Sequence, residues 1–207
     1  SDDYYPAIQR DHVRLVTDAI ERVEANGVRT KDGALHEVDA LILATGFEAA
    51  EHLSPFEIRG AGGALLADRW ARGGEAYRGT TIAGFPNLFL VVGPNTGLGH
   101  GSMIFMIESQ IEYVLGALAA MRGKGARAVD VKPGAQNRYN DRIQAGLERT
   151  VWATGGCKSW YRTKDGKNTT LWPGFMFQFR LAMRRFDVEA YHVLSAPRTA
   201  ARAVAGG

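Results

Sequence analysis

Four glycines stand within nine positions of one short stretch, at residues 93, 97, 99 and 101. An uninterrupted apolar run, Leu88 to Val92, precedes them, and Ser102 follows where the N-cap of a helix would stand. A helix N-terminus offers free backbone N–H groups and about half a positive charge, and glycines let a ligand approach the backbone closely. The stretch therefore suits an electron-rich ligand. It equally fits an ordinary strand–loop–helix connection in which glycine merely permits the turn, and on these residues alone both interpretations stay open.

Two apolar runs that end at glycine define the expected architecture. Leu88–Val92 has no polar break, which is typical of a strand buried on both faces of a parallel sheet. Val38–Ala44 reads as a second buried strand and ends at Thr45-Gly46. Helical character follows the glycine-rich loop from Ser102 to about Arg122. Because strands alternate with helices, the sequence predicts an α/β fold, although it contains neither a GxGxxG fingerprint nor a Walker loop.

Shorter patterns predict the remaining elements. Alternating residues over 20–24 and 27–30, with a turn at Lys31-Asp32-Gly33, indicate a small antiparallel meander that ends near Glu37. Apolar residues at helical spacing predict helices over 135–150 and 175–186. The other expected elements are short strands at Val13–Thr17, Ala64–Ala67 and Ala128–Val131, an aromatic loop over 151–173, and a disordered tail after Leu194.

The composition excludes several classes of function. The chain has 207 residues, a net charge of +3 and a pI of about 9.1, and its basic residues are scattered, so we expect no nucleic-acid partner. Cys157 is the one cysteine, which rules out an internal disulfide and suits a reducing compartment. The longest apolar helix carries Glu108 and Glu112, so we expect no membrane span. These features predict a cytoplasmic protein.

Three motifs resemble those of class B flavoprotein monooxygenases, and of Baeyer–Villiger monooxygenases in particular. Residues 39–47, DALILATGF, are similar to the motif that closes the NADPH-binding domain in this family. Residues 85–102, FPNLFLVVGPNTGLGHGS, resemble its C-terminal flavin-binding stretch. Residues 156–161 and 168–174, GCKSWY and NTTLWPG, resemble a segment typical of the Baeyer–Villiger branch. Tyr4-Tyr5-Pro6-Ala7 also matches the end of the family's NADPH domain.

The resemblance implies a partial two-dinucleotide-binding-domain flavoprotein fold of the α/β class. Residues 1–46 would supply the β-meander and closing strand of the NADPH-binding domain, and residues 47–194 the C-terminal part of the FAD-binding domain. Residues 195–207 would be a disordered tail. The glycine fingerprints and the active-site arginine of the family would precede this sequence, so we expect the C-terminal portion of a longer enzyme. No catalytic residue and no metal ligand are assigned.

The resemblance also implies which residues contact the cofactors, FAD and NADPH. The loop and the start of the helix would face the negative charge of reduced flavin. Asn95 would bond the ribityl chain, and His100 would contact either the flavin or the backbone. Trp172 would line a substrate pocket or a domain interface, whereas Cys157 is expected to be inert. The expected cofactor-binding residues are Thr45, Gly46, Gly93, Asn95, Thr96, Gly97, Leu98, His100 and Met103.

The implied reaction is the insertion of one O2-derived oxygen atom into a ketone, which gives an ester or lactone. One alternative is oxygenation of nitrogen or sulfur in a heteroatom substrate, although residues 172–174, WPG, favour the ketone reaction. A second alternative is a non-catalytic module that associates without holding a cofactor tightly. An apolar surface left by domains missing from this sequence would favour a homo-oligomer. The chain alone is expected not to oxidise NADPH.

Overall fold

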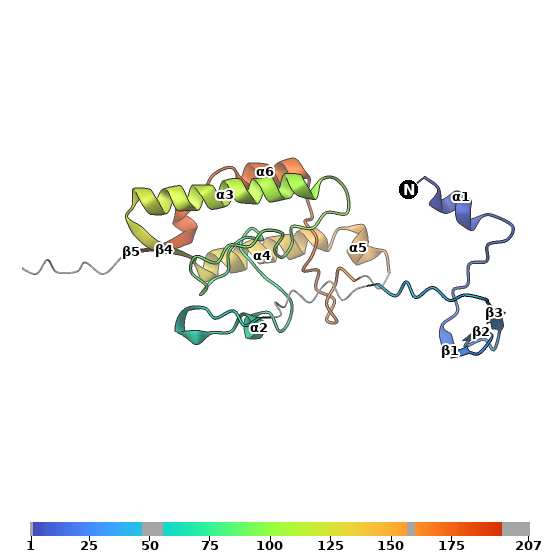
Figure 1. The fold of residues 1–207 in the computed structure, drawn as a ribbon. Helices are drawn as coiled ribbons and strands as arrows, with labels where there is room; N and C mark the ends of the chain where they lie inside the picture. Colours follow the sequence, from blue (N-terminus) through green and yellow to red (C-terminus); the bar gives the residue numbers. More distant parts are fainter. Residues whose placement is uncertain (1, 47–55, 157–159, 196–207) are drawn as a thin grey trace, which may run out of the picture. The chain divides into compact units, whose positions relative to one another are not determined.

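Two compact units make up the chain, residues 1–46 and residues 47–207. We call them the N-terminal unit and the C-terminal unit. The structure is a computed structural model that describes residues 2–46, 56–156 and 160–195 (Figure 1). The boundary between the units falls directly after Gly46. Their assignment to an NADPH-binding and an FAD-binding domain stays a prediction.

An antiparallel three-stranded meander forms the centre of the N-terminal unit, as the sequence predicts. The strands pair in chain order, and Val28 of the middle strand stands opposite Val23 on one side and His36 on the other. Thr30 and Asp32 close the second turn, because the Thr30 hydroxyl donates to Asp32 Oδ1 at 2.5 Å. The elements of this unit are α1 (Tyr4–Ile8), β1 (Ile20–Glu24), β2 (Gly27–Thr30) and β3 (Leu35–Glu37).

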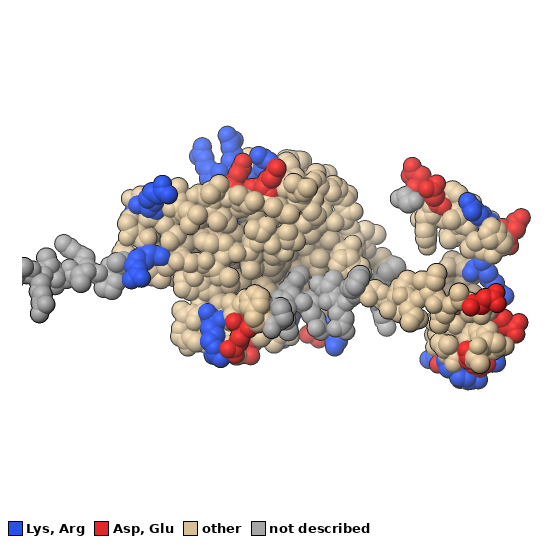
Figure 2. Space-filling view, viewed as in Figure 1, with Lys and Arg blue, Asp and Glu red and all other residues tan. Residues whose placement is uncertain are grey.

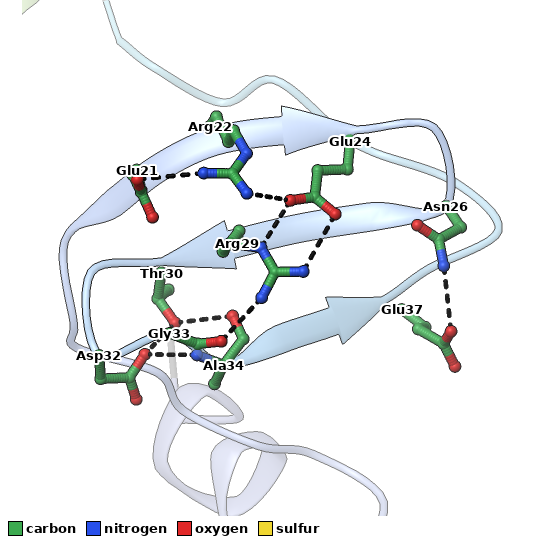
Figure 3. Close-up of polar contacts among 10 residues, drawn as sticks. All are labelled: Glu21, Arg22, Glu24, Asn26, Arg29, Thr30, Asp32, Gly33, Ala34 and Glu37. Atoms are coloured by element: carbon green, nitrogen blue, oxygen red, sulfur yellow. Dashed lines mark hydrogen bonds and ion pairs between the residues drawn. The ribbon is translucent and has the colours of Figure 1, made fainter.

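Charged side chains, rather than an apolar core, connect the strands of this meander (Figure 3). Arg29 Nε donates to Glu24 Oε1 at 2.5 Å, and its Nη1 donates to the carbonyl of Gly33 at 2.8 Å. Arg22 approaches the same Glu24 oxygen at 2.8 Å. The hydrogen bond from Arg29 lowers the pKa of Glu24 below its ordinary value. Because these groups are open to solvent, they align the strands but contribute little to stability.

Two strands predicted for the N-terminal unit are wrong. Val13–Thr17 and Val38–Ala44 have no strand structure, and in the second run Ile42 is 87% exposed and Leu43 is 76% exposed. An extended segment becomes a strand only when a neighbour pairs with its N–H and C=O groups. Within the described residues no strand pairs with 38–44, so this apolar run faces outward.

Helices dominate the C-terminal unit, and one antiparallel strand pair accompanies them. β4 pairs with β5, with Val131 opposite Tyr191. Two of the helices, α3 and α6, lie side by side (Figure 1). The elements of this unit are η1 (Ala61–Gly63), α2 (Leu66–Arg69), α3 (Met103–Gly123), β4 (Ala126–Val131), α4 (Pro133–Leu147), α5 (Val151–Thr154), α6 (Met176–Met183), η2 (Val188–Ala190) and β5 (Tyr191–Ser195).

Local signals in the sequence place most of these elements correctly. Ser102 caps α3 as predicted, and its Oγ accepts a hydrogen bond from Phe105 N–H at 3.4 Å. The strand predicted at 128–131 and the helices predicted from 135 and 175 are confirmed as β4, α4 and α6. Pro133 stands at the first position of α4, where its missing N–H costs nothing because that group has no helical partner.

Other predictions for the C-terminal unit are wrong. Leu88–Val92 forms no strand, since it has only an isolated bridge between Phe89 and Thr81, and Val91 and Val92 are 48% and 47% exposed. Ala64–Ala67 is not a strand, because α2 begins inside it. α5 interrupts the loop expected over 151–173. The tail at 196–207 lies outside the described residues.

α3 buries several polar side chains and exposes several apolar ones. Ser109, Gln110 and Tyr113 on this helix are fully buried, whereas Leu115 and Leu118 face outward. Figure 2 shows charged side chains of both signs over α3 and α6, on a surface that otherwise carries few charges. By length and composition α3 could cross a membrane, but one such helix is weak evidence, and the absence of a membrane span remains a prediction.

A buried polar cluster joins α3 to the segment before β5. The hydroxyl groups of Tyr113 and Tyr77 both donate to Asp187, the second at 2.5 Å. Arg78 Nη2 lies 3.1 Å from the same carboxylate. Tyr113 also bonds the Tyr191 hydroxyl at 3.1 Å. One carboxylate therefore accepts from three partners that come from two separate parts of the chain.

Asp187→Ala should destabilise the C-terminal unit. The substitution leaves two buried hydroxyl groups and a guanidinium without their acceptor, and losing hydrogen bonds to a charged group costs about 1.5–3 kcal/mol. Urea unfolding followed by circular dichroism measures this loss. Glu189→Ala is the matched control, because Glu189 is an exposed acidic residue on the same turn. Equal stabilities of the two variants would contradict the prediction.

The buried tyrosines predict a loss of stability at high pH. Burial raises the pKa of Tyr113, Tyr139 and Tyr191 above the ordinary value of about 10. Above that pH the unfolded state binds fewer protons than the folded state, so the free energy of unfolding falls as pH rises. We expect a decrease of up to about 1.4 kcal/mol per pH unit for each such tyrosine. Urea unfolding at several pH values tests this, and ionisation of all tyrosines near pH 10 in a folded protein would contradict it.

Candidate functional site

The N-terminus of α3 is open. The Ser102 side chain caps the N–H of Phe105, but no described residue accepts a hydrogen bond from the N–H of Met103 or Ile104. Residues 99–102, directly before the helix, are exposed. Two free amides at the positive end of a helix of 21 residues can bind an anionic or electron-rich group.

The segment over 168–172 forms backbone hydrogen bonds with the glycine-rich loop. Asn95 N–H donates to Thr169 O, and Gly97 N–H donates to Thr170 O, both at 2.8 Å. The N–H of Trp172 returns a bond to Gly97 O, also at 2.8 Å, which gives a short parallel bridge. The two motifs that lie far apart in the sequence are therefore neighbours in the structure.

Asn95 is buried, and its side chain binds the protein itself. It is buried in the left-handed region at a φ of 58°, and its Nδ2 donates to the carbonyls of Asn168 at 2.9 Å and Leu171 at 3.0 Å. Asparagine is one of the few residues that tolerates this backbone conformation. The side-chain amide faces the 168–171 segment, so its position favours a role in building the loop over the predicted contact with a ribityl chain.

Only glycine fits at position 101, at the end of the loop. Its φ is +89°, and a Cβ there would lie 2.5 Å from the sulfur of Met176. The same sulfur accepts a hydrogen bond from the N–H of Ser102 at 3.3 Å. The first turn of α6 thus packs against the backbone that leads into α3, and it keeps the entrance to the helix in place.

A buried hydroxyl group beside the loop has no partner. Thr170 Oγ1 makes no hydrogen bond within the described part of the chain, and the methyl group of the same side chain lies close to Gly97. Such groups normally bind protein, water or ligand. The unpaired hydroxyl and the free amides of α3 belong to the same loop and its support, so the site can accept further polar contacts.

The predicted site residues fall in both units of the chain. The loop residues from Gly93 to Met103 and Trp172 come together in the C-terminal unit, and there Leu98 and Met103 pack against the core while His100 is exposed. Trp172 is partly buried, its Nε1 donates to Phe175 O at 3.2 Å, and its ring meets Phe179 edge-on. Packing therefore accounts for most of its contacts. Thr45 and Gly46 are exposed and belong to the N-terminal unit.

Sequence reasoning did not predict how two residues support this site. Gln110 connects α3 to the loop, and Asp187 anchors the middle of the same helix. Gln110 follows the stretch that resembles the family's flavin-binding motif, but nothing in the sequence indicated the bonds that it makes. Asp187 offered no signal, because its partners Tyr77 and Tyr113 are far away in the sequence.

Curated relatives match the chain along nearly its whole length, although no family model matches it. A Baeyer–Villiger monooxygenase of Pseudomonas aeruginosa is 49% identical over 201 residues, which are 97% of this chain and 38% of that protein. A Baeyer–Villiger monooxygenase of Streptomyces coelicolor is 44% identical over 195 residues, which are 94% of this chain and 38% of that protein. The chain corresponds to part of a class B flavoprotein monooxygenase. This confirms the resemblance found in the motifs.

Solved structures place the fold in the same class. The cyclohexanone monooxygenase of Rhodococcus sp. Phi1 bound to NADP+ is 30% identical with a TM-score of 0.73, over 95% of this chain and 38% of that one. OTEMO in complex with FAD and NADP is 28% identical with a TM-score of 0.70, over 92% of this chain and 37% of that one. The predicted partial two-dinucleotide-binding flavoprotein fold is thus confirmed, and the chain spans about 38% of the length of the first two curated relatives.

Two substitutions at Asn95 separate the contribution of its side chain from that of its backbone. Asn95→Ala removes two hydrogen bonds and leaves a Cβ in the left-handed region, so we expect a loss of about 2–4 kcal/mol in the free energy of unfolding. Asn95→Gly loses the same bonds without the backbone cost and should be about 1 kcal/mol more stable than Asn95→Ala. Urea unfolding measures both. If Asn95→Ala were as stable as the wild type, the supporting role of this residue would be wrong.

Proposed function

We propose that the chain is part of an FAD- and NADPH-dependent monooxygenase that inserts one oxygen atom from O2 into a ketone, which gives an ester or lactone. The observation that carries this proposal is 49% identity to a Baeyer–Villiger monooxygenase over 97% of the chain. That match covers nearly the whole chain, and so includes the glycine-rich loop and the N-terminus of α3. In this proposal residues 1–46 end the NADPH-binding domain and residues 47–194 end the FAD-binding domain.

The residues of the loop fit a flavin. Met103 and Ile104 offer free backbone amides, the glycines between 97 and 101 expose the backbone, and Thr170 offers an unpaired hydroxyl. We assign to FAD the loop from Gly93 to Met103, and Thr45 and Gly46 of the N-terminal unit stay predicted cofactor-binding residues. When bound, FAD together with NADPH supplies the redox chemistry that activates O2.

The chain contributes binding and electrostatics to this reaction. Reduced flavin carries negative charge, and a helix N-terminus stabilises such a charge by about 0.3–2 kcal/mol. Each amide that donates to a charged acceptor adds about 1.5–3 kcal/mol. The amides of Met103 and Ile104 are the groups in a position to do this. Trp172, held behind Gly97, forms the base of the loop and is our candidate for contact with the substrate side.

The substrate class follows from the relatives. Proteins named Baeyer–Villiger and cyclohexanone monooxygenase favour a ketone over the alternative of oxygenation at nitrogen or sulfur. The proposed partners are therefore a small ketone and O2, and the proposed compartment is the cytoplasm. No residue of this chain is proposed as a catalytic residue.

A second candidate function is association without catalysis. A groove of about 740 Å³ beside α3 and α6 is lined by Leu115, Phe177 and Leu181 together with charged Glu112, Arg180 and Arg184. The side chains of Leu115, Phe177 and Leu181 are all exposed. An apolar surface of this kind favours contact with a further protein surface. In the isolated chain it would produce a homo-oligomer.

FAD binding by the purified chain tests the proposal. We expect FAD to bind with its fluorescence quenched and the chain not to oxidise NADPH. His100→Glu should weaken binding by about tenfold, which is about 1.4 kcal/mol, because it places a negative charge at the open end of α3. His12→Glu makes the same change at an exposed residue of the N-terminal unit and should not alter binding.

Gel filtration of the same samples separates the two candidate functions. Co-elution of FAD with the chain supports the flavin site. A cofactor-free dimer or larger species, with no quenching at any FAD concentration, would contradict the flavin site and favour the association module. NADPH consumption by the chain and FAD alone would overturn the expectation that this part of the enzyme is inactive by itself.

A further inference from the structure

We propose that Gln110 is a positioning residue that fixes the backbone over residues 92–97 in the conformation that receives the cofactor. The inference rests on the proposed function, because it concerns the loop assigned to FAD. It goes beyond that function by naming the side chain that sets the geometry of the loop. Gln110 stands two turns into α3 and touches none of the proposed cofactor-binding amides.

The carboxamide of Gln110 is fully used inside the protein. Its side chain is completely buried, and its Oε1 accepts a hydrogen bond from Val92 N–H at 2.9 Å. Its Nε2 donates to Gly79 O at 3.0 Å and to Thr80 Oγ1 at 3.1 Å, with a longer contact to Leu90 O at 3.4 Å. One side chain therefore ties the helix to the turn at 79–80 and to the segment directly before the loop.

The backbone that Gln110 holds is strained. Val92 has a φ of 59°, a left-handed conformation that a β-branched residue rarely adopts. Such a residue keeps this conformation only where its surroundings determine it. The hydrogen bond to Gln110 fixes the N–H of Val92 directly. The direction in which the chain leaves Val92 then decides where the loop begins.

At Gly93 the backbone packs directly against the turn at 79–80. A Cβ at Gly93 would collide with the carbonyl oxygen of Gly79, so the chain passes directly over the turn at 79–80. Gln110 binds that same carbonyl. The two segments therefore lie in close contact, held by the Gln110 carboxamide and by the hydrogen bond from Leu90 N–H to Thr80 O at 2.7 Å. From there Asn95 and Gly97 continue the loop along the 168–172 segment.

Packing alone does not explain a glutamine at this position. An apolar side chain of similar volume would fill the space, but it would leave the N–H of Val92 without its acceptor and the carbonyl of the buried Gly79 without its donor. Gln136 provides a comparison within the same unit. It is also buried, and its Oε1 accepts from Ala83 N–H at 2.7 Å, but none of its contacts reaches the loop.

Hydrogen exchange of single amides tests the inference in the full 207-residue chain. In Gln110→Met we expect exchange at Val92 to be about a hundredfold faster, and exchange at Asn95 and Gly97 about tenfold faster, because the loop opens locally. The β4–β5 amides should be unchanged. The matched control Gln136→Met should accelerate Ala83 and leave the loop amides as in the wild type.

Two further variants show whether the hydrogen bonds themselves matter. Gln110→Glu keeps an acceptor for Val92 N–H but loses both donated bonds, so protection of Val92 should be partly restored relative to Gln110→Met. Thr80→Val removes only one acceptor of Gln110 and should loosen the loop less, which provides a test if Gln110→Met does not fold. Wild-type exchange at Asn95 and Gly97 in Gln110→Met, or acceleration of the same amides by Gln136→Met, would overturn the proposal.

FAD titration links the loop to its ligand. Gln110→Met should weaken FAD binding by about tenfold while Gln136→Met does not, at temperatures where both variants are folded. A loosened loop with unchanged FAD affinity would overturn the positioning role. If the wild type binds no FAD, the proposed function fails, and the exchange pattern alone then decides whether Gln110 fixes the loop.

Discussion

The C-terminal unit depends on a stripe of hydrogen-bonding side chains along the buried face of α3. Ser109 Oγ donates to Phe105 O at 2.7 Å, Gln110 binds the segments before the loop, and Tyr113 reaches Asp187. The Ser109 bond lies within α3, but Gln110 and Tyr113 bind groups outside the helix and would lose these partners if α3 rotated, whereas an apolar stripe tolerates small rotations. The rotation and the depth of α3 are thereby fixed, and so is the point in space where its N-terminus ends.

The outer face of the same helix mixes apolar and charged side chains. Leu115 and Leu118 are exposed, while Glu108 and Glu112 stand near Arg180 of α6, which pairs with Glu112 at 3.2 Å. A helix of a finished surface normally turns its polar side to water. The exposed leucines of α3 fit a surface that is covered by another protein surface. The chain spans 38% of the length of its Pseudomonas aeruginosa relative.

Sequence reasoning succeeded wherever one short segment determines its own structure. Ser102 caps a helix, Pro133 starts one, and the turn after β2 needs only neighbouring residues. It failed at Val38–Ala44 and Leu88–Val92. These apolar runs have the composition of strands buried in a sheet, but a strand also needs neighbouring strands that pair with it. The described residues supply no such neighbours. β5 was missed because Tyr191–Ser195 has no clear alternation and becomes a strand by pairing with β4.

The motifs predict a site, but they do not reveal the residues that support it. The glycine-rich loop is a predicted cofactor site and Trp172 a predicted pocket or interface residue, and the structure joins Gly97 to the 171–172 segment. The interpretation of Asn95 concerned a ligand, whereas its amide binds two carbonyl groups of the protein. Hydrogen-bond partners so distant in the sequence follow no periodicity, and no local pattern can reveal them.

The distance along the chain between the loop and its support also dictates an order of assembly. Asn95 bonds to residues 73 and 76 positions later, and Tyr113 to one 74 positions later. During synthesis the glycine-rich loop leaves the ribosome long before Leu171 is added. α3 can therefore form while the loop before it still lacks its hydrogen-bond partners in the 168–172 segment. Bringing the two ends of so long a stretch together has an entropic cost. The hydrogen bonds that offset this cost form only when both ends have been synthesised. The glycine-rich loop therefore reaches its final conformation after α3 has formed, and until then the N-terminus of the helix lacks the 168–172 segment that supports the loop before it.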